Sequence, residues 1–185
     1  MSDAGKRVTV IDTRRDVESG NIVHCCDPTG IAVGDVVEAH IDWDRRYRHM
    51  RVHTCLHLPC SMVPFPVNGG SIGDGRGRLD FDMAETVDKE DLESRLNALI
   101  AVDHAVSYRW ITDAEMVQNM DLVRTMSVRP PMGAGRVRLV DIDWVDLQPC
   151  GGTHLTRTGE IGQVTIGKVE KKGKQNRRIN VVLAG

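Results

Sequence analysis

Two short motifs with metal-binding side chains lie far apart in this chain, and their separation constrains the fold more than any other feature. The first is HTCLH at residues 53–57, and the second is CGGTH at residues 150–154. From His57 to Cys150 the distance is 150 − 57 = 93 residues. If both motifs serve one site, the fold must bring them together, which is typical of a site between structural elements and not of a short zinc finger.

The HTCLH motif falls within a predicted helix. Asp42 or Asp44 would cap the helix with a side-chain oxygen, and the helix would run over residues 45–58. Pro59 then removes a backbone donor and is expected to end or kink the helix just after the last histidine of the motif. Two histidines four residues apart on a helix point the same way, so both can reach one ion.

We therefore expect His53, His57, Cys150 and His154 to bind one metal ion. Three nitrogens and one sulfur suit a tetrahedral Zn²⁺. Four protein ligands also fit a closed structural site, whereas a catalytic zinc usually keeps one position open, and the ligand set alone does not separate these cases. Cys60 is a rival ligand if Pro59 kinks the helix towards the site.

The remaining pattern indicates an α+β fold with an antiparallel sheet and helices. Short strands expected at residues 8–11, 21–24 and 36–41 are separated by Gly, Asp and Pro turns, which predicts a small β unit over residues 1–43. Asp88 begins the clearest helix, with leucines on one side and charges on the other. Further strands are expected at 79–83, 107–110, 137–145, 164–169 and 179–183, with a helix at 113–126 and a loop or hairpin at 64–78.

Composition excludes several classes of protein. The chain is 41% hydrophobic and 27% charged with a net charge of −2, which is ordinary for a soluble globular protein and argues against a polybasic, histone-like one. No apolar run reaches the roughly 18 residues of a membrane helix, and the segment MSDAGKRVTV lacks the apolar core expected of a secretory signal peptide. Five cysteines, an odd number, do not indicate a disulfide scaffold. We expect a cytoplasmic protein with no membrane partner.

Six segments occur in an order that resembles a known family. They are HTCLHL, NGGSI, RLDFDM, LQPCGGTH, TGEIG and KGKQNRR. Together they resemble the editing domain of alanyl-tRNA synthetase, and most of all its free-standing relatives, the AlaX trans-editing proteins. The related editing domain of threonyl-tRNA synthetase lacks the full set of four ligands. The resemblance covers nearly the whole chain.

The resemblance implies a fold, a cofactor and an activity. It implies a two-layer editing domain with an antiparallel sheet over residues 44–185, preceded by a small β-barrel over residues 1–43. The four matched positions would be ligands of Zn²⁺. The expected activity is hydrolysis, without a nucleotide cofactor, of tRNA(Ala) that wrongly carries serine or glycine. It would act in trans and release the free amino acid.

Two departures from the family pattern concern the barrel and the first helix. Longer members carry a glycine-rich segment in the barrel, and MSDAG at the start of this chain resembles only the end of that segment. Either the true start lies upstream or the barrel is truncated. In addition, Pro59 stands where the family usually continues its helix with leucine.

Selection of serine needs a hydroxyl partner near the metal, because an apolar pocket distinguishes isosteres poorly. Thr54, beside the first ligand, is the candidate catalytic residue, although a threonine on a helix often bonds to its own backbone instead. Other groups that we expect to bind substrate are Asn68, Gly69, Ser71, Gly151 and Gly152. An ordinary hairpin turn is the alternative for Asn68 and the glycines that follow it.

Basic residues in the first helix and near the C-terminus are candidates for contacts with tRNA phosphates. They are Arg46, Lys171, Lys172, Lys174, Arg177 and Arg178. A solvated charged face is the alternative. Two other functions also remain open: a binding module in which structural zinc holds a degenerate editing fold on tRNA or a synthetase without catalysis, and a zinc hydrolase of a small ester or amide.

Overall fold

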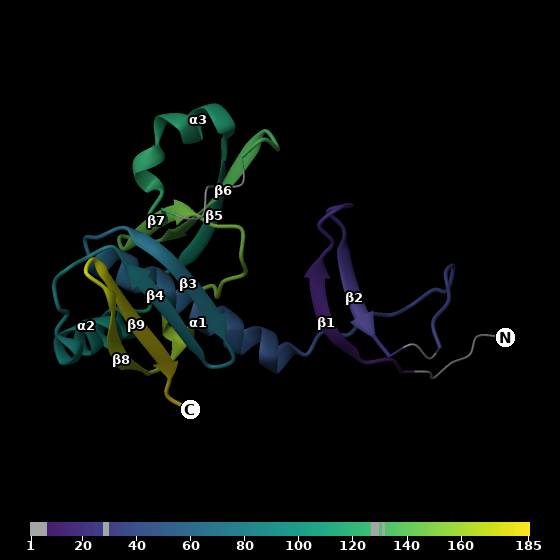
Figure 1. Ribbon diagram of the computed structural model, residues 1–185, viewed down its shortest axis with the longest axis horizontal. Helices are drawn as coiled ribbons and strands as arrows, with labels where there is room; N and C mark the ends of the chain where they lie inside the picture. Colours follow the sequence, from purple (N-terminus) through teal and green to yellow (C-terminus); the bar gives the residue numbers. More distant parts are fainter. Residues whose placement is uncertain (1–6, 28–29, 127–129, 131) are drawn as a thin grey trace. The chain divides into compact units, whose positions relative to one another are not determined.

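The computed structural model describes residues 7–27, 30–126, 130 and 132–185. The chain divides into two compact units, residues 1–40 and 41–185, and each is described by itself (Figure 1). In the first unit, β1 (Val10–Arg15) pairs antiparallel with β2 (Ile22–Cys26). The described residues of this unit form no further strand and no closed barrel, so they show one antiparallel pair where a small barrel was expected.

The prediction of a strand at residues 36–41 is wrong. This stretch pairs with no described strand, and the side chains of Val36 and Val37 are 101% and 61% exposed. Valine favours strands because it packs well on a pleated, half-buried surface. Without a partner strand or a core to pack against, that preference does not produce a strand.

The second unit contains a four-stranded antiparallel sheet with the order β3-β4-β9-β8. Its strands, drawn side by side in Figure 1, are β3 (Val67–Gly73), β4 (Arg76–Phe81), β8 (Val164–Gly173) and β9 (Asn176–Leu183). The helix α2 (Lys89–Val102) packs on β8. As expected, Asp88 caps this helix and accepts hydrogen bonds from the backbone of Glu90 and Asp91.

A separate three-stranded antiparallel sheet has the order β5-β6-β7, formed by β5 (Val106–Thr112), β6 (Arg136–Ile142) and β7 (Asp146–Pro149). After β5 come the short helix α3 (Asp113–Gln118) and a 3₁₀ turn, η1 (Met120–Leu122), in place of one helix over residues 113–126. Another 3₁₀ turn, η2 (Thr158–Ile161), precedes β8. The α+β class is confirmed, with its antiparallel strands divided between sheets. None of the helices in the described part of the chain could span a membrane.

The helix α1 (Trp43–Met62) contacts β3, β4 and β9 of one sheet and β7 of the other. Between two sheets a helix is buried on more than one side, and residue 52 and residues 54–60 of α1 are all buried. Gly77 of β4 permits the close approach, because a Cβ there would lie 2.6 Å from Cγ1 of Val52. Side chains of α1 and of both sheets join in one hydrophobic core.

We expected Pro59 to end or kink α1, and the helix does not end there. The helix continues to Met62, and the backbone N–H of Val63 donates to the carbonyl of Pro59 at 2.9 Å. Proline removes one donor, but the turn that follows is held by other bonds. Cys60 donates its thiol to the carbonyl of Leu56 at 3.4 Å, and the Ser61 hydroxyl donates to the carbonyl of Leu58 at 2.8 Å. Burial of Pro59 and Cys60 in the core offsets the lost hydrogen bond.

Candidate metal centre

The four expected metal ligands gather at one point of the second unit. His53 and His57 come from α1, and Cys150 and His154 come from the loop after β7. Their ligand atoms all lie within 4.8 Å of one another. Sγ of Cys150 is 3.5 Å from Nε2 of His53 and 3.3 Å from Nε2 of His154. In a tetrahedral zinc site, ligand atoms lie about 3.3–3.6 Å apart, and the two distances from Sγ of Cys150 fall in that range.

Contacts behind the cluster orient two of its imidazoles. Nδ1 of His57 lies 3.2 Å from Oδ2 of Asp146, and Nδ1 of His154 lies 3.3 Å from the Thr54 hydroxyl. In each ring the outer nitrogen is thus occupied and Nε2 remains for the ion, which is the arrangement that metal-binding histidines adopt. The residues can hold a metal ion, and their chemistry is consistent with zinc.

The carboxylate of Asp146 is itself held in a buried position on β7. Its Oδ2 accepts a hydrogen bond of 2.6 Å from Nε2 of Gln148. Oδ1 finds no hydrogen-bond partner among the described residues, and Nε of Arg124 lies 4.0 Å from it. Because a buried, incompletely paired carboxylate is costly, its position behind a metal ligand indicates a role in orienting that ligand.

The CGGTH loop is fastened to β6 and α1. Arg138 donates to the carbonyls of Cys150, at 2.9 Å, and of Gly152, and the backbone N–H of Cys150 donates to Arg138 at 3.1 Å. The Thr54 hydroxyl accepts a hydrogen bond of 3.1 Å from the backbone of Leu155. These bonds connect both halves of the cluster to rigid elements and limit how far the ligands can separate.

The glycines of the loop have different surroundings. A Cβ on Gly152 would lie 2.2 Å from Cε1 of His53, so any side chain at this position would displace a ligand. A Cβ on Gly151 would meet nothing within 4 Å. Gly152 is therefore explained by the metal centre, whereas no packing among the described residues requires a glycine at Gly151.

Mutual contacts change the ionisation of the cluster. Burial opposes the thiolate of Cys150, but hydrogen bonds from His154 and His53 outweigh it and lower the pKa of Cys150 to about 3. Burial lowers the pKa of His154 to about 4. Burial acts in the same direction on His57, but the hydrogen bond to Asp146 prevails and raises its pKa to about 9. The thiolate of Cys150 and the neutral imidazole of His154 are the forms that bind a metal, whereas His57, protonated at neutral pH, would release a proton on binding.

Comparison with known proteins identifies the family. Residues 137–180 match the family model described as threonyl and alanyl tRNA synthetase second additional domain. The "Alanyl-tRNA editing protein AlaX-M" of Methanosarcina mazei is 36% identical over 174 residues, which cover 87% of this chain and 69% of that protein. The chain belongs to the AlaX family of alanyl-tRNA editing proteins.

Further relatives extend the comparison. The AlaX-M protein of Saccharolobus solfataricus is 31% identical over 184 residues, 97% of this chain and 77% of its own length. An alanine–tRNA ligase of Saccharolobus islandicus is 33% identical over 189 residues, which cover 91% of this chain but only 19% of the ligase. The chain thus spans 69% and 77% of the length of these two AlaX-M proteins and 19% of the much longer ligase.

Cys60, the rival ligand, and Cys55, which lies between the two histidines of α1, are both outside the cluster. Cys55 is fully buried, and burial raises its pKa to about 12. Cys60 is buried too, points its thiol at a helix carbonyl, and has its pKa raised to about 12, first by burial. Both are therefore neutral thiols of the core, and neither belongs to the cluster of potential ligands.

Other residues that we expected to bind substrate lie in several places. Thr54 and Gly152 adjoin the cluster directly, and Gly151 is exposed beside it. Asn68 and Gly69 lie on β3, at a point where its register with β4 shifts, and Ser71 is exposed further along that strand. Their contact with substrate stays a prediction.

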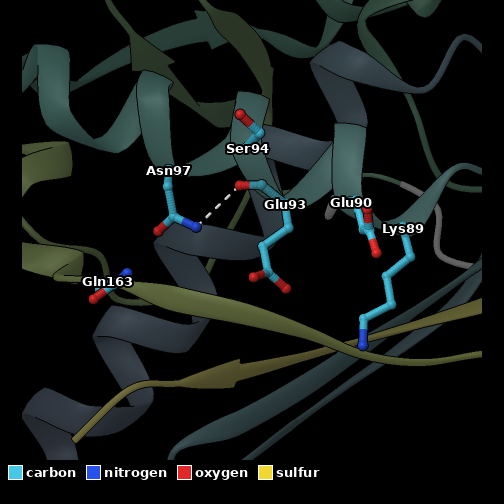
Figure 2. Close-up of a pocket in the computed structure, with 6 residues that line it drawn as sticks. All are labelled: Lys89, Glu90, Glu93, Ser94, Asn97 and Gln163. Carbon is cyan, nitrogen blue, oxygen red and sulfur yellow. Dashed lines mark hydrogen bonds between the residues drawn. The ribbon is translucent and has the colours of Figure 1, made fainter.

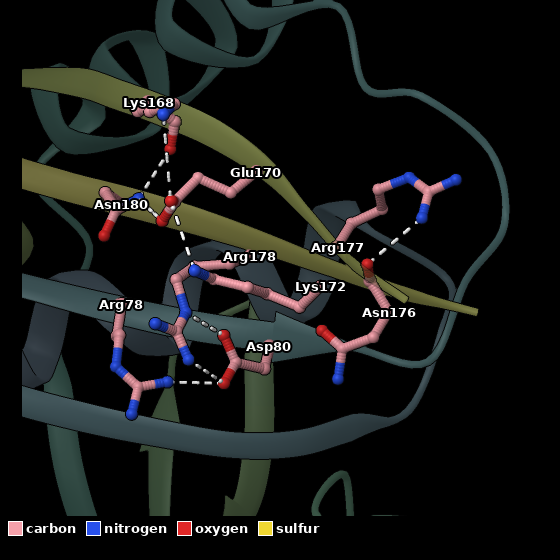
Figure 3. A network of polar contacts seen from close by, with 9 residues as sticks. All are labelled: Arg78, Asp80, Lys168, Glu170, Lys172, Asn176, Arg177, Arg178 and Asn180. Carbon is pink, nitrogen blue, oxygen red and sulfur yellow. Dashed lines mark hydrogen bonds and ion pairs between the residues drawn. The ribbon is translucent and has the colours of Figure 1, made fainter. Parts of the chain in front are cut away.

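The basic residues near the C-terminus form the hairpin of β8 and β9 (Figure 3). Arg177 is buried and donates to the backbone carbonyls of Gly173, Asn176 and Ala84. Arg178 is paired with Asp80 at 2.7 and 2.9 Å.

Other expected tRNA contacts are more open. Nζ of Lys172 lies 3.3 Å from Glu170. Lys171, Lys174 and, on α1, Arg46 are exposed and form no ion pair within the described residues. The hairpin therefore combines internally paired cations with exposed ones.

An open hollow of about 530 Å³ lies elsewhere in the unit, along α2 (Figure 2). Its lining includes Glu93, Asn97 and Gln163, and none of its residues belongs to the metal cluster. Asn97 exchanges hydrogen bonds with the backbone of Val164, and Glu93 accepts one from Ile166. These side chains attach α2 to β8, so the polar groups that line the hollow stabilise the packing of the helix on the sheet.

Sequence reasoning missed the functional neighbours of the ligands, namely Asp146, Gln148 and Arg138. A signal was present for two of them. Asp146 and Gln148 are two residues apart in a strand directly before the CGGTH motif, so both must point to one face of the sheet. No local signal marks Arg138, because its role depends on the pairing of β6 with the loop.

Proposed function

We propose that this chain is a trans-acting aminoacyl-tRNA hydrolase that removes serine or glycine from mischarged tRNA(Ala). The observation that carries the proposal is the cluster of His53, His57, Cys150 and His154, which combines a zinc-type donor set with membership of the alanyl-tRNA editing family. Residues 44–185 would form the editing domain.

The side chains of the centre have distinct proposed roles. The four ligands hold Zn²⁺, which supplies Lewis-acid chemistry for ester hydrolysis. Asp146 and Gln148 keep His57 in the ligating orientation, and Arg138 holds the CGGTH loop. Because Asp146 contacts the outer nitrogen of His57, it is placed to orient a ligand and not to take a proton from an attacking water.

Thr54 remains our candidate for the selection of serine. Its side chain is fully buried. Its oxygen contacts Nδ1 of His154 and accepts a hydrogen bond from the backbone N–H of Leu155. A threonine hydroxyl accepts two hydrogen bonds and donates one, so its proton remains for a substrate oxygen that reaches the centre. Asn68, Gly69, Ser71 and Gly151 would complete the substrate site.

Exposed cations would add affinity for the tRNA body. We assign this role to Arg46, Lys171, Lys172 and Lys174, whose side chains reach solvent. Arg177 and Arg178 would support the hairpin that presents the lysines, because their guanidinium groups already bind carbonyls or Asp80.

The proposal is tested with purified tRNA(Ala) charged separately with serine, glycine and alanine. We expect loss of the seryl or glycyl ester, retention of the alanyl ester, and loss of activity after treatment with a chelator that is reversed by Zn²⁺. The variant Cys150→Ala is the matched inactive control, because it removes one ligand from the same fold.

Other outcomes would point elsewhere. Binding of tRNA without turnover of any ester would favour the non-catalytic binding module. If the protein hydrolyses none of the three charged tRNAs but hydrolyses a small ester only when zinc is present, the result would favour the zinc hydrolase of a small ester or amide. Either result contradicts the proposed editing activity.

A further inference from the structure

One face of the three-stranded sheet continues outward from the metal centre to an exposed edge strand. Residues that pair directly across antiparallel strands share a face. Trp110 pairs with Arg138, and Tyr108 pairs with Val140, which in turn pairs with Gln148. This face therefore includes Gln148 beside the metal ligands, and it extends to the aromatic residues of β5.

Aromatic rings and guanidinium groups alternate along this face. The ring of Tyr108 lies 6.4 Å from that of His154, between centroids. Cζ of Arg138 is 4.7 Å from the centroid of Tyr108, and Cζ of Arg136 is 4.7 Å from that of Trp110. We name these four residues, Tyr108, Trp110, Arg136 and Arg138, the aromatic platform.

The core does not explain the platform. Tyr108 and Trp110 are 44% and 56% exposed, and neither belongs to a hydrophobic cluster. Arg136 is exposed and, among the described residues, has no acidic partner. On the opposite face of the same sheet, by contrast, Arg109 lies 3.9 Å from Asp141. The platform therefore leaves aromatic surface and positive charge available together.

Those two properties match one ligand chemistry. Proteins bind single-stranded nucleic acid by stacking bases on aromatic rings beside cations that attract the phosphates, and arginine adds cation–π contacts. A folded protein partner would bury the rings equally well, but it would not require an unpaired cation over the outer ring. Continuity with His154 further favours a strand whose end enters the metal centre.

We propose that the aromatic platform binds the single-stranded 3′ end of the tRNA, with bases on Trp110 and Tyr108 and phosphates near Arg136. The strand would run along the sheet face so that its terminal ester reaches the cluster of metal ligands, past the open position at Gly151. This inference deepens the proposed function and rests on it for the identity of the RNA.

A binding experiment tests the platform without any hydrolysis. The chain has three tryptophans, at positions 43, 110 and 144, so the double variant Trp43→Phe and Trp144→Phe leaves Trp110 as the only tryptophan reporter. Titration with a short single-stranded RNA that ends in ACCA is expected to quench its fluorescence through stacking. The same RNA annealed to its complement is expected to quench far less, because its bases are already stacked in the duplex.

Substitutions extend the test to affinity. Trp110→Ala is expected to weaken binding of the ACCA RNA about 5- to 100-fold, the range found for loss of one stacked base, and Trp110→Phe to retain most of it. Arg136→Ala is expected to weaken binding and to reduce its salt dependence. The matched control is Trp144→Ala, since Trp144 is also exposed but lies between β6 and β7, outside the strands β5 and β6 that carry the platform.

Kinetics with seryl-tRNA(Ala) separate this inference from the proposed function. If the wild type hydrolyses the ester and Trp110→Ala raises KM with little change in kcat, the result supports both the proposed function and the platform inference. If the wild type is active and Trp110→Ala matches it in KM and RNA affinity, the platform inference is overturned while the activity remains. If ACCA RNA quenches Trp110 but no ester is hydrolysed, the platform stands and the activity fails. Shielding of Trp110 by another part of the chain or a second copy, without response to RNA, would also overturn the inference.

Discussion

Two exposed sheet faces of this protein both carry arginine, but they use it differently. On the four-stranded sheet, Arg78 and Arg178 both bind Asp80, so each guanidinium has a carboxylate partner within the sheet (Figure 3). On the three-stranded sheet, Arg136 and Arg138 lie over aromatic rings. On the first face both arginines have a carboxylate partner, whereas on the second Arg136 lies over Trp110 and has no acidic partner among the described residues.

This difference shows why a count of basic residues does not locate a binding surface. The hairpin of β8 and β9 has the densest run of cations in the sequence, yet two of its arginines are already occupied by the protein itself. The aromatic platform has only two arginines, spread along β6. What matters is which partner each guanidinium finds after folding.

The largest effect should follow from removal of a ligand on the three-stranded side. Cys150→Ala is expected to lose stoichiometric zinc and to reduce hydrolysis to the uncatalysed rate, because the thiolate is the only sulfur donor of the cluster. Zinc content by atomic absorption and single-turnover deacylation measure both effects. Arg178→Ala, on the four-stranded face, should keep its zinc. An equal loss of zinc and of hydrolysis in both variants would contradict the proposal that the two faces have different functions.

The next effect concerns the carboxylate behind His57. Asp146→Asn is expected to lower zinc affinity about 10- to 100-fold, because second-layer partners that orient a histidine ligand contribute that much. Competition with a zinc-binding dye measures the affinity. The matched control is Asp141→Asn, which removes a carboxylate from the opposite face of the same sheet. Unchanged affinity in Asp146→Asn would show that His57 needs no such partner.

The two loop glycines offer a sharper local comparison. Gly152→Ala is expected to cost about 1–3 kcal/mol in zinc binding or stability through overpacking, because its Cβ would meet the His53 ring. Gly151→Ala should leave zinc affinity as it is, since that position is open. Isothermal titration of zinc into the apo forms distinguishes the variants. A tolerant Gly152→Ala would mean that the loop is less tightly held than the contacts of Arg138 indicate.

The smallest effect is expected on the four-stranded face, and on stability alone. Asp80→Asn should lower the free energy of unfolding by about 1–2 kcal/mol, because it leaves Arg78 and Arg178 without their shared partner. Hydrogen bonds from Arg178 hold the pKa of Asp80 below its ordinary value of 3.8. The carboxylate therefore stabilises the fold above about pH 4, and this contribution is lost as the pH falls through the folded-state pKa.

Urea unfolding of the wild type and Asp80→Asn between pH 7 and pH 3 measures that difference. Zinc content and affinity for ACCA RNA should be the same in both proteins. A large loss of RNA affinity in Asp80→Asn would show that the four-stranded face takes part in RNA binding. That result would contradict the assignment of RNA binding to the three-stranded face.

Local sequence determined the parts of this protein that depend on local chemistry. The spacing of His53 and His57 places both on one helix face, and Asp88 caps α2 because its side chain reaches the first free N–H groups of the same helix. The donor types at Cys150 and His154 were equally visible, and the structure brings all four together. The resemblance of the motifs to the AlaX family led us to expect that these four residues bind Zn²⁺ in an editing site.

Only the tertiary structure decided the features that depend on neighbours distant in the chain. Burial between two sheets carries α1 past Pro59, whereas residues 36–41, without a partner, form no strand. The pairing of β5, β6 and β7 puts Asp146 behind His57 and aligns Trp110 with Arg138. Helix spacing and capping act over a few residues, but the environment of a carboxylate or a guanidinium is set by whichever strand lies beside it, and one sequence read alone does not specify that strand.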